Sequence, residues 1–528
     1  MKKYISILFF ISGIIFAQQE QKSIELPDFV ITGRQSIEVQ AAQKRKPDLI
    51  STLSQDFFTP QYSPEELPLM LTSEPKKIVP SITAGDDYFS GLLSVGAGRY
   101  TLPMGNLSLS KSFSNFLISA NVWGSNIKEY IPNAGYNTSG LSLSNNIFFD
   151  TDSGLLAGTN IKLAGAYWRD SYKFFASPIP LFERKTNRGN AGLSILNNYE
   201  RKFNFSLNLN ADFLTIVESD ISERKLAVDG GFNLKISNLT IGAIGKYQKQ
   251  ILNNNLSGID DYGFYLVNGM LKISPSKTFN LVIGAEIAGN SVNTFFSPFG
   301  LMQFQLDKGL FFNMEFKPHA ENYTLLNFID QNLYIVNGFT DNIFSEVKID
   351  LKSSINYEFD KIFTIALWGN YSSTDNFLYF EDYLAKGFFD VRSALDVKSI
   401  SAGLNVLIHP NQLGYFSGEL KFQDIRDVND NYIPYRPNFI TNLTYGIDFD
   451  FGIGLKFKYR FAYDTYTDIL NSAKLSAYHN LSAGFSYKLL NNLSLTADFQ
   501  NILNRSNFVF GGYQEKLFDV ILGAVYRW

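Results

Sequence analysis

The sequence contains no cysteine and only three histidines among its 528 residues. Without cysteine the chain can form no disulfide, no thiolate metal site and no lipid-modified cysteine. His319, His409 and His479 are expected at a strand end, in a tight turn and inside a strand, so no two of them have the spacing of metal ligands. We therefore predict neither a metal site nor a cofactor site.

After residue 17 the sequence has no apolar run long enough to form a transmembrane helix. The formal net charge is only −4, so the chain lacks the strongly basic face that nucleic-acid binding requires. Helical membrane proteins are thereby excluded, and nucleic acid is not expected as a partner.

No catalytic constellation is recognisable, since no serine stands beside a candidate base. The stretch that begins at Asp427 matches the start of a calcium loop, but Tyr432 occupies the glycine position and Asn438 that of the bidentate glutamate. We expect a solvated external loop there, and a loop pair without a third partner at Asp260 and Asp261. The protein is predicted not to be an enzyme.

The first 17 residues have the pattern of a secretory signal peptide. Lys2 and Lys3 precede an apolar run from Tyr4 to Phe16, which is followed by Ala17 and a polar stretch. Because this run is too short to span a bilayer, we predict a signal peptide over residues 1–17, cut after Ala17, rather than a retained anchor.

The last ten residues read as a β-strand that ends on an aromatic residue. Successive side chains of a strand point to opposite faces. One face of this strand carries Val520, Leu522, Ala524, Tyr526 and Trp528. We predict that this face meets lipid and that the barrel-assembly machinery recognises its terminal aromatic; an ordinary amphipathic strand is the alternative.

Similar alternation recurs along the chain from Tyr88 onward. Phe203 to Phe213 alternates with amides and Asp212, and Phe451 to Tyr463 alternates with glycine and cationic residues. The apolar face of such a strand can meet lipid, and the polar face can line a water-filled lumen. The abundant Phe and Tyr suit the aromatic belts at the two membrane interfaces.

Short and long connections alternate between these segments. Ten tight turns are expected at residues 112–115, 149–154, 199–202, 236–238, 274–277, 306–309, 358–361, 409–412, 449–452 and 489–492. The longer stretches between them include residues 169–185, 320–342, 375–395, 425–435 and 504–516. We therefore predict an all-β fold over residues 88–528: a transmembrane antiparallel β-barrel of the bacterial outer-membrane type, with about 22 strands and a range of about 20 to 24.

Segments near both ends resemble the TonB-dependent receptors of the outer membrane. The C-terminal likeness lies in residues 434–439, 481–487 and 499–505, with Asn-Ile-Leu-Asn at 501–504 and Gly-Tyr at 512–513. Residues 26–34 resemble the segment with which these receptors engage TonB, and its core here is Asp28, Phe29, Val30, Ile31, Thr32 and Gly33. Such a segment pairs as a strand with the edge of the partner's sheet, and an ordinary short strand or linker is the alternative.

One feature departs from that family, whose members carry a plug domain of well over a hundred residues. Only residues 18–87 lie between the predicted signal peptide and the first strand, which is too few for a full plug. This segment is polar and contains seven prolines, namely Pro27, Pro47, Pro60, Pro64, Pro68, Pro75 and Pro80. It is expected to be a periplasmic linker or to fill the lumen, since a barrel of this size would otherwise be an open hole.

Two function classes remain open. The resemblance implies an integral outer-membrane receptor that takes up an unidentified solute and is coupled to TonB. Aromatic loops such as 172–175 and 377–380 would meet the ligand in that case; the alternative is that these aromatics belong to the interface belt or pack against other loops. The alternative is a plugless barrel that anchors other envelope proteins and transports nothing. An ordered N-terminal segment that responds to ligand would distinguish the first from the second.

Overall fold

The computed structural model describes residues 90–149, 157–197, 202–254, 258–337, 344–360, 362–383, 385–409 and 413–528. The predicted signal peptide, the segment 18–87 and its TonB-box-like stretch lie outside the described residues. Within the described part of the chain, no helix is both long and apolar enough to cross a membrane.

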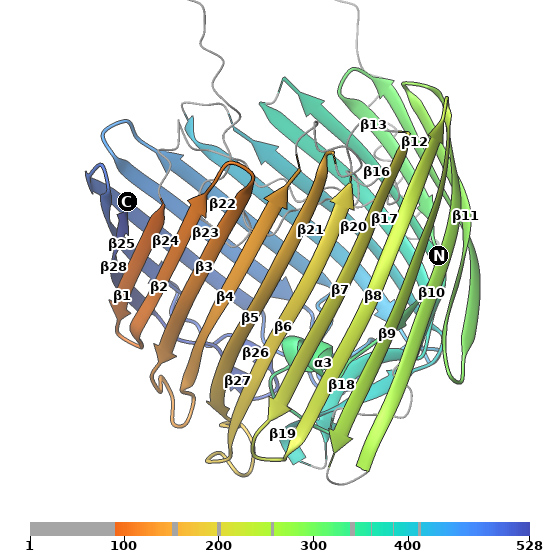
Figure 1. The fold of residues 1–528 in the computed structure, drawn as a ribbon. Coiled ribbons are helices and arrows are strands. Elements are labelled where there is room, and N and C mark those ends of the chain that lie inside the picture. Colours follow the sequence, from red (N-terminus) through yellow and green to blue (C-terminus); the bar gives the residue numbers. More distant parts are fainter. Residues whose placement is uncertain are drawn as a thin grey trace, which may run out of the picture. The chain divides into compact units, whose positions relative to one another are not determined.

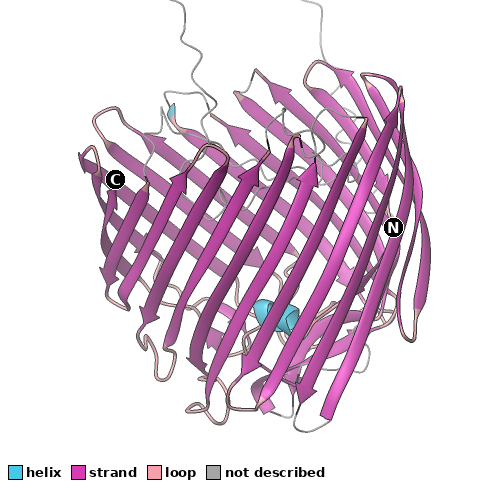
Figure 2. Ribbon diagram, in the orientation of Figure 1, coloured by secondary structure: helices cyan, strands magenta, loops and turns pink. Residues whose placement is uncertain are grey.

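Most of the described residues form one large antiparallel sheet (Figures 1 and 2). Its first half consists of β1 (Gly91–Gly98), β2 (Thr101–Ser112), β3 (Phe116–Ile127), β4 (Tyr136–Phe148), β5 (Thr159–Lys173), β6 (Glu183–Asn197), β7 (Phe203–Ile216), β8 (Ile221–Ile236), β9 (Leu239–Asn254), β10 (Gly258–Ser276) and β11 (Phe279–Asn290). Its second half consists of β12 (Thr294–Asp307), β13 (Leu310–Phe316), β14 (His319–Asn322), β16 (Phe344–Phe359), β17 (Phe363–Asp375), β20 (Val397–Ile408), β21 (Tyr415–Arg426), β22 (Phe439–Asp448), β23 (Ile453–Tyr463), β24 (Tyr478–Leu490), β25 (Leu493–Gln500) and β28 (Asp519–Arg527).

The sheet closes on itself because its first and last strands pair. Leu93 of β1 stands opposite Tyr526 of β28, and the antiparallel register continues to Gly98 opposite Ile521. β13 and β14 both pair with β16, so they form a single wall strand interrupted at Lys317 and Pro318. Proline has no N–H for the ladder, which explains the break. The wall therefore has 22 strands, and the predicted all-β barrel and its strand number are confirmed.

The two faces of the wall differ in chemistry. On β7 the apolar residues Phe203, Leu209 and Phe213 are exposed on the outside. On the inside, the Asn208 amide donates to the Asp229 carboxylate of β8 at 2.8 Å. The predicted alternation is therefore present, with apolar side chains outward and hydrogen-bonded polar side chains toward the lumen.

Ten connections gather at one end of the barrel, here the turn end, and eleven at the other, the loop end, which points downward in Figure 1. Each predicted turn lies at the junction of two observed strands, but several begin too early. β12 extends to Asp307, β16 to Phe359 and β24 to Leu490, each one residue beyond the predicted start of its turn, and β10 extends two residues beyond it, to Ser276. Parts of the predicted turns 149–154, 199–202, 358–361 and 409–412 lie outside the described residues.

The loop end contains additional secondary structure that the sequence did not predict. Helix α3 (Leu325–Gln331) and β15 (Ile335–Asn337) follow β14, and β18 (Phe377–Tyr383) and β19 (Ala385–Ala394) form a hairpin between β17 and β20. β26 (Phe508–Phe510) and β27 (Tyr513–Gln514) precede the last strand. The loop predicted over residues 169–185 is shorter than expected, because β5 continues to Lys173 and β6 starts at Glu183.

Candidate functional site

Five connections at the loop end pack together into one unit, which we call the lid: residues 174–182, 323–337, 376–396, 427–438 and 501–518. Its apolar core contains Phe328, Ile335, Leu378, Phe380, Phe389, Val391, Phe510 and Tyr513. Sheet pairing adds to this packing, since β15 runs parallel to β19, with Ile335 opposite Phe389. Buried apolar area of this kind holds segments together that lie far apart in the sequence.

A stacked pair of tyrosines lies at the centre of the lid. The rings of Tyr334 and Tyr513 have centroids 3.4 Å apart and an interplanar angle of 15°. The Tyr513 hydroxyl donates to the carbonyl of Gly387 at 2.6 Å, which joins the last loop to the β18–β19 hairpin. Burial raises the pKa of the Tyr334 phenol well above its ordinary value, so this ring remains neutral.

Two glycines allow three loops to meet closely around Ala176. Gly387 has a φ of +86°, and a Cβ there would lie 2.5 Å from the Ala176 carbonyl oxygen. Gly512 has a φ of +81°, and its Cβ would lie 2.9 Å from the Ala176 side chain. Only glycine combines this backbone conformation with so close an approach.

Helix α3 is fixed to the inner wall at its N-terminus. The Glu223 carboxylate of β8 accepts hydrogen bonds from the backbone N–H groups of Leu325 at 2.8 Å and Leu326 at 3.0 Å. A carboxylate at this position also interacts favourably with the helix dipole. Leu325 and Ile329 pack on an apolar part of the inner wall that includes Leu214, Ile216 and Leu252.

Two arginines of β6 fix the same loop from the other side. Arg188 forms an ion pair with Asp330 of α3, and its Nε lies 3.4 Å from Asp170 of β5. Arg184 donates to the carbonyl of Ile335 and lies 4.7 Å from the centre of the Phe174 ring. The lid is thus attached to the wall by charged hydrogen bonds, which are stronger than neutral ones.

A cavity of about 390 Å³ lies between the lid and the inner wall of β16, β17, β20 and β21. Its lining is polar with aromatic members and includes His319, Glu321, Tyr323, Asp350, Lys352, Trp368, Asn370, Lys421, Gln423 and Arg436. Desolvation lowers the pKa of the Arg436 guanidinium, whereas Tyr323 and Glu321 act in the opposite direction. Charges of both signs and aromatic faces suit a polar solute more than an apolar one.

A second cavity of about 360 Å³ lies on the other side of Glu321 and Tyr323, which line both. The Tyr323 hydroxyl donates to the Glu321 carboxylate, so these two side chains form a hydrogen-bonded partition. Among the described residues, no group of three or more metal-ligating side chains comes together.

Several residues singled out in the sequence lie in the lid. Phe174 is fully buried, Phe175 packs against the aromatic core, and Leu378 and Phe380 belong to that core. These loop aromatics therefore pack against other loops.

The stretch that resembles the start of a calcium loop is held by its own hydrogen bonds. The Asp427 carboxylate accepts hydrogen bonds from the backbone N–H groups of residues 429 and 431.

The apolar side chains of the C-terminal strand lie on the outer face, as the alternation in the sequence predicts. Leu522, Tyr526 and Trp528 are exposed, whereas Asp519 and Ile521 are buried on the inner face. The chain end is paired, since the N–H groups of Gly91 and Trp528 each donate to the other's carbonyl. A role of these residues in assembly remains a prediction, as does the role of Asp28 to Gly33.

The sequence reading missed the residues that hold the lid: Arg184, Arg188, Glu223, Gly387 and Gly512. The sequence carried one signal for the first three, namely a charged residue at a lumenal position near the loop end of a strand. Such a residue must have a partner when it is buried. Arg184, Arg188 and Glu223 are all at most 4% exposed.

No protein-family model matches the sequence. No curated protein matches it either. Solved structures do resemble its fold. The FrpB iron transporter from Neisseria meningitidis has a TM-score of 0.66 and 10% identity, over 84% of this chain and 82% of that chain.

Two siderophore-related receptors have a similar likeness. For the siderophore receptor PirA from Acinetobacter baumannii, the TM-score is 0.66 at 9% identity, over 83% of this chain and 80% of that chain. For the ferric-catecholate import receptor Fiu from E. coli K12, the TM-score is 0.62 at 9% identity, over 83% of this chain and 82% of that chain. At these identities the likeness concerns the fold: the chain has the 22-strand barrel architecture of outer-membrane import receptors.

Proposed function

We propose that the protein is an integral outer-membrane importer of the TonB-dependent-receptor type, which takes up a polar solute that the structure does not identify. The observation that carries this proposal is the combination of a 22-strand barrel with a lid that is packed and anchored as a unit. A barrel of this width without internal filling would form a large aqueous channel, so a lid is expected where passage is controlled.

The site beneath the lid supports the same proposal. The cavity with Arg436, Trp368 and Lys421 lies on the lumenal side of the lid, where a solute released inward would first meet the wall. The solved structures with this fold are named as iron transporters and siderophore receptors. A scaffold that transports nothing needs neither a packed and anchored lid nor a polar cavity under it, so that alternative is not favoured.

Energy coupling is assigned to Asp28, Phe29, Val30, Ile31, Thr32 and Gly33, which lie outside the described residues. In this proposal the segment adds as a strand to the periplasmic partner TonB, through backbone hydrogen bonds. Residues 18–87 fill part of the lumen in the same proposal, and the face with Tyr526 and Trp528 is the surface that the assembly machinery recognises.

Site-specific cross-linking tests the proposal. Because the natural chain has no cysteine, Ile31→Cys introduces a unique thiol that can be cross-linked to a cysteine placed in TonB. We expect a cross-link in cells, lost when Val30→Pro is added, because proline removes a strand-pairing donor. Val39→Pro is the matched control outside the segment, and it should leave the cross-link intact. If no cross-link forms with the assembled barrel, or if Val30→Pro leaves it unchanged, the coupling proposal is wrong.

A further inference from the structure

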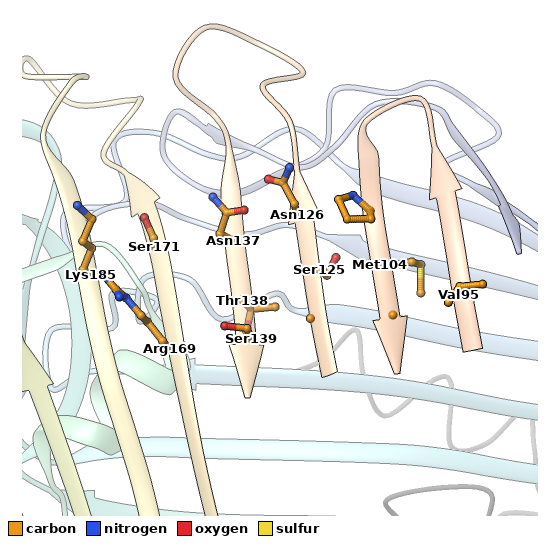
Figure 3. A pocket seen from close by; sticks show the side chains of 13 residues that line it. Val95, Met104, Ser125, Asn126, Asn137, Thr138, Ser139, Arg169, Ser171 and Lys185 are labelled. Atoms are coloured by element: carbon orange, nitrogen blue, oxygen red, sulfur yellow. The ribbon is translucent and has the colours of Figure 1, made fainter. Parts of the chain in front are cut away.

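The outer wall carries a groove with both apolar and charged lining residues over strands β1 to β6, near the loop end (Figure 3). It has a volume of about 680 Å³. Its lining includes Gly105, Gly124, Asn126, Asn137, Arg169 and Lys185. These residues have the strand parity of exposed Val122 and Leu141, so they face away from the lumen.

Strand register arranges the outward residues in rows that cross the strands. One row is apolar and consists of Leu107, Val122, Leu141 and Tyr167. The next row toward the loop end consists of Gly105, Gly124, Ser139 and Arg169. The third row consists of Asn126, Asn137, Ser171 and Lys185. The wall thus changes from apolar to polar within one step, which is where hydrocarbon gives way to lipid headgroups.

The depression exists because two paired glycines have no side chains. Gly105 stands opposite Gly124 in neighbouring strands. A Cβ at Gly124 would have its nearest contacts at 3.7 Å and 3.8 Å, which are ordinary van der Waals distances. A Cβ therefore fits at Gly124 without displacing its neighbours, and a side chain there would extend into the groove.

The charge in the groove is positive and only partly neutralised. Arg169 is exposed and makes no hydrogen bond or ion pair with the described residues. Lys185 lies 3.2 Å from Glu183, a carboxylate that also accepts from the Ser171 hydroxyl. Elsewhere near the loop end, Lys249 is neutralised by Asp261 at 2.8 Å, whereas Arg224 is exposed on β8 and, among the described residues, has no second cation in a groove beside it. The presence of two cations, Arg169 and Lys185, in one depression makes the groove a place where an anion would be stabilised.

We propose that this groove binds the phosphate-bearing headgroup of an anionic lipid in the leaflet that surrounds the loop end. A guanidinium matches phosphate geometry with two parallel hydrogen bonds, and the neighbouring ammonium of Lys185 adds a second charge. Asn137 and Ser139 supply neutral polar groups between them, and the acyl chains lie along the apolar row. The proposal rests on the barrel lying in a membrane but not on transport.

Native mass spectrometry of the full chain in mild detergent tests it, with bis-phosphorylated lipid A as the probe. We expect the wild type to retain the lipid, and Arg169→Ala with Lys185→Ala to weaken binding by about 25-fold, or about fivefold per cation. Arg224→Ala is the matched control, since Arg224 is exposed near the loop end of β8, outside the groove. It should bind as the wild type does.

A second variant fills the groove without changing its charge. Gly124→Val should weaken lipid binding severalfold while the barrel still migrates as a folded, heat-modifiable species. Equal losses in Arg224→Ala, equal retention of fully dephosphorylated lipid A, or displacement of the lipid by millimolar inorganic phosphate would each overturn the proposal. None of these outcomes bears on the TonB cross-link, so failure here is distinguishable from failure of the importer proposal.

Discussion

The two ends of the barrel are held together in different ways. At the turn end, apart from the Gly91–Trp528 pair that closes the wall, the backbone bonds lie within one turn or between neighbouring strands, as between the Phe113 N–H and the Phe116 carbonyl at 2.8 Å. At the loop end the contacts join distant parts of the chain: the Tyr130 hydroxyl donates to the Gln514 carbonyl across 384 residues, and Tyr513 donates to Gly387 across 126. The turn end is thus part of the wall, whereas the lid is a tertiary unit placed upon it, and we expect the lid to be disrupted without loss of the barrel.

The largest effect is expected at the turn end, where the wall closes. Replacing Tyr526 and Trp528 together by Asp places charge on the lipid face and removes the terminal aromatic, so the chain should fail to enter the outer membrane. Heat-modifiable migration of outer-membrane fractions measures this.

Val525→Asp is the matched control for that variant, because Val525 alternates with Tyr526 and faces the lumen. It should assemble. A heat-modifiable barrel in normal amount from the double Asp variant would show that the outward face of this strand has no role in assembly.

At the loop end, Gly387→Val should disrupt the lid and leave the wall intact. The positive φ disfavours a β-branched residue, and the new Cβ would collide with the Ala176 carbonyl, for a combined cost of about 4 kcal/mol to the lid. We expect the loops to become sensitive to trypsin and single-channel conductance to rise.

Gly245→Val is the control on the wall, since a Cβ there would meet nothing within 4 Å. It should keep wild-type protection and conductance. Equal protease sensitivity in both variants, or none in Gly387→Val, would contradict a lid that packs independently of the wall.

A smaller effect is expected where the lid meets the inner wall. Arg188→Ala leaves the Asp170 carboxylate buried without its cation, and both side chains are 5% exposed in the wild type. The loss should be about 3 kcal/mol and should appear in urea unfolding of the loops before that of the barrel. Arg224→Ala, at an exposed outward position, should change stability by less than about 0.5 kcal/mol. A loss in Arg188→Ala no larger than this would mean that the β6 anchor does not hold the lid.

The smallest effect is expected from Glu223→Gln. Glutamine keeps the size of the side chain but has a single acceptor oxygen for the two N–H groups at the start of α3, so the cost should be about 1 kcal/mol. Hydrogen exchange of the Leu325 and Leu326 amides measures it. Unchanged protection of both amides would argue that Glu223 does not fix the helix.

The sequence was sufficient for the wall and insufficient for the lid, for one physical reason. Alternation such as that from Phe203 to Phe213, and turns such as 449–452, depend on residues that are neighbours in the sequence. Strand number and topology could therefore be predicted. The lid depends on pairs such as Tyr334 with Tyr513 and Gly387 with Ala176, which no local pattern reveals. Strand ends were misplaced around residues 169–185 because polar lumenal residues such as Arg184 resemble loop residues when their partners are unknown.

Single-channel conductance in planar bilayers tests the importer proposal most directly, with the mature chain compared with a chain lacking residues 18–87. We predict low conductance for the mature chain, a clear rise when the segment is removed, and greater entry of large antibiotics into cells that carry the truncated barrel. Equal conductance and equal antibiotic entry, together with no cross-link between Ile31→Cys and TonB, would contradict the proposal and leave a barrel that transports nothing.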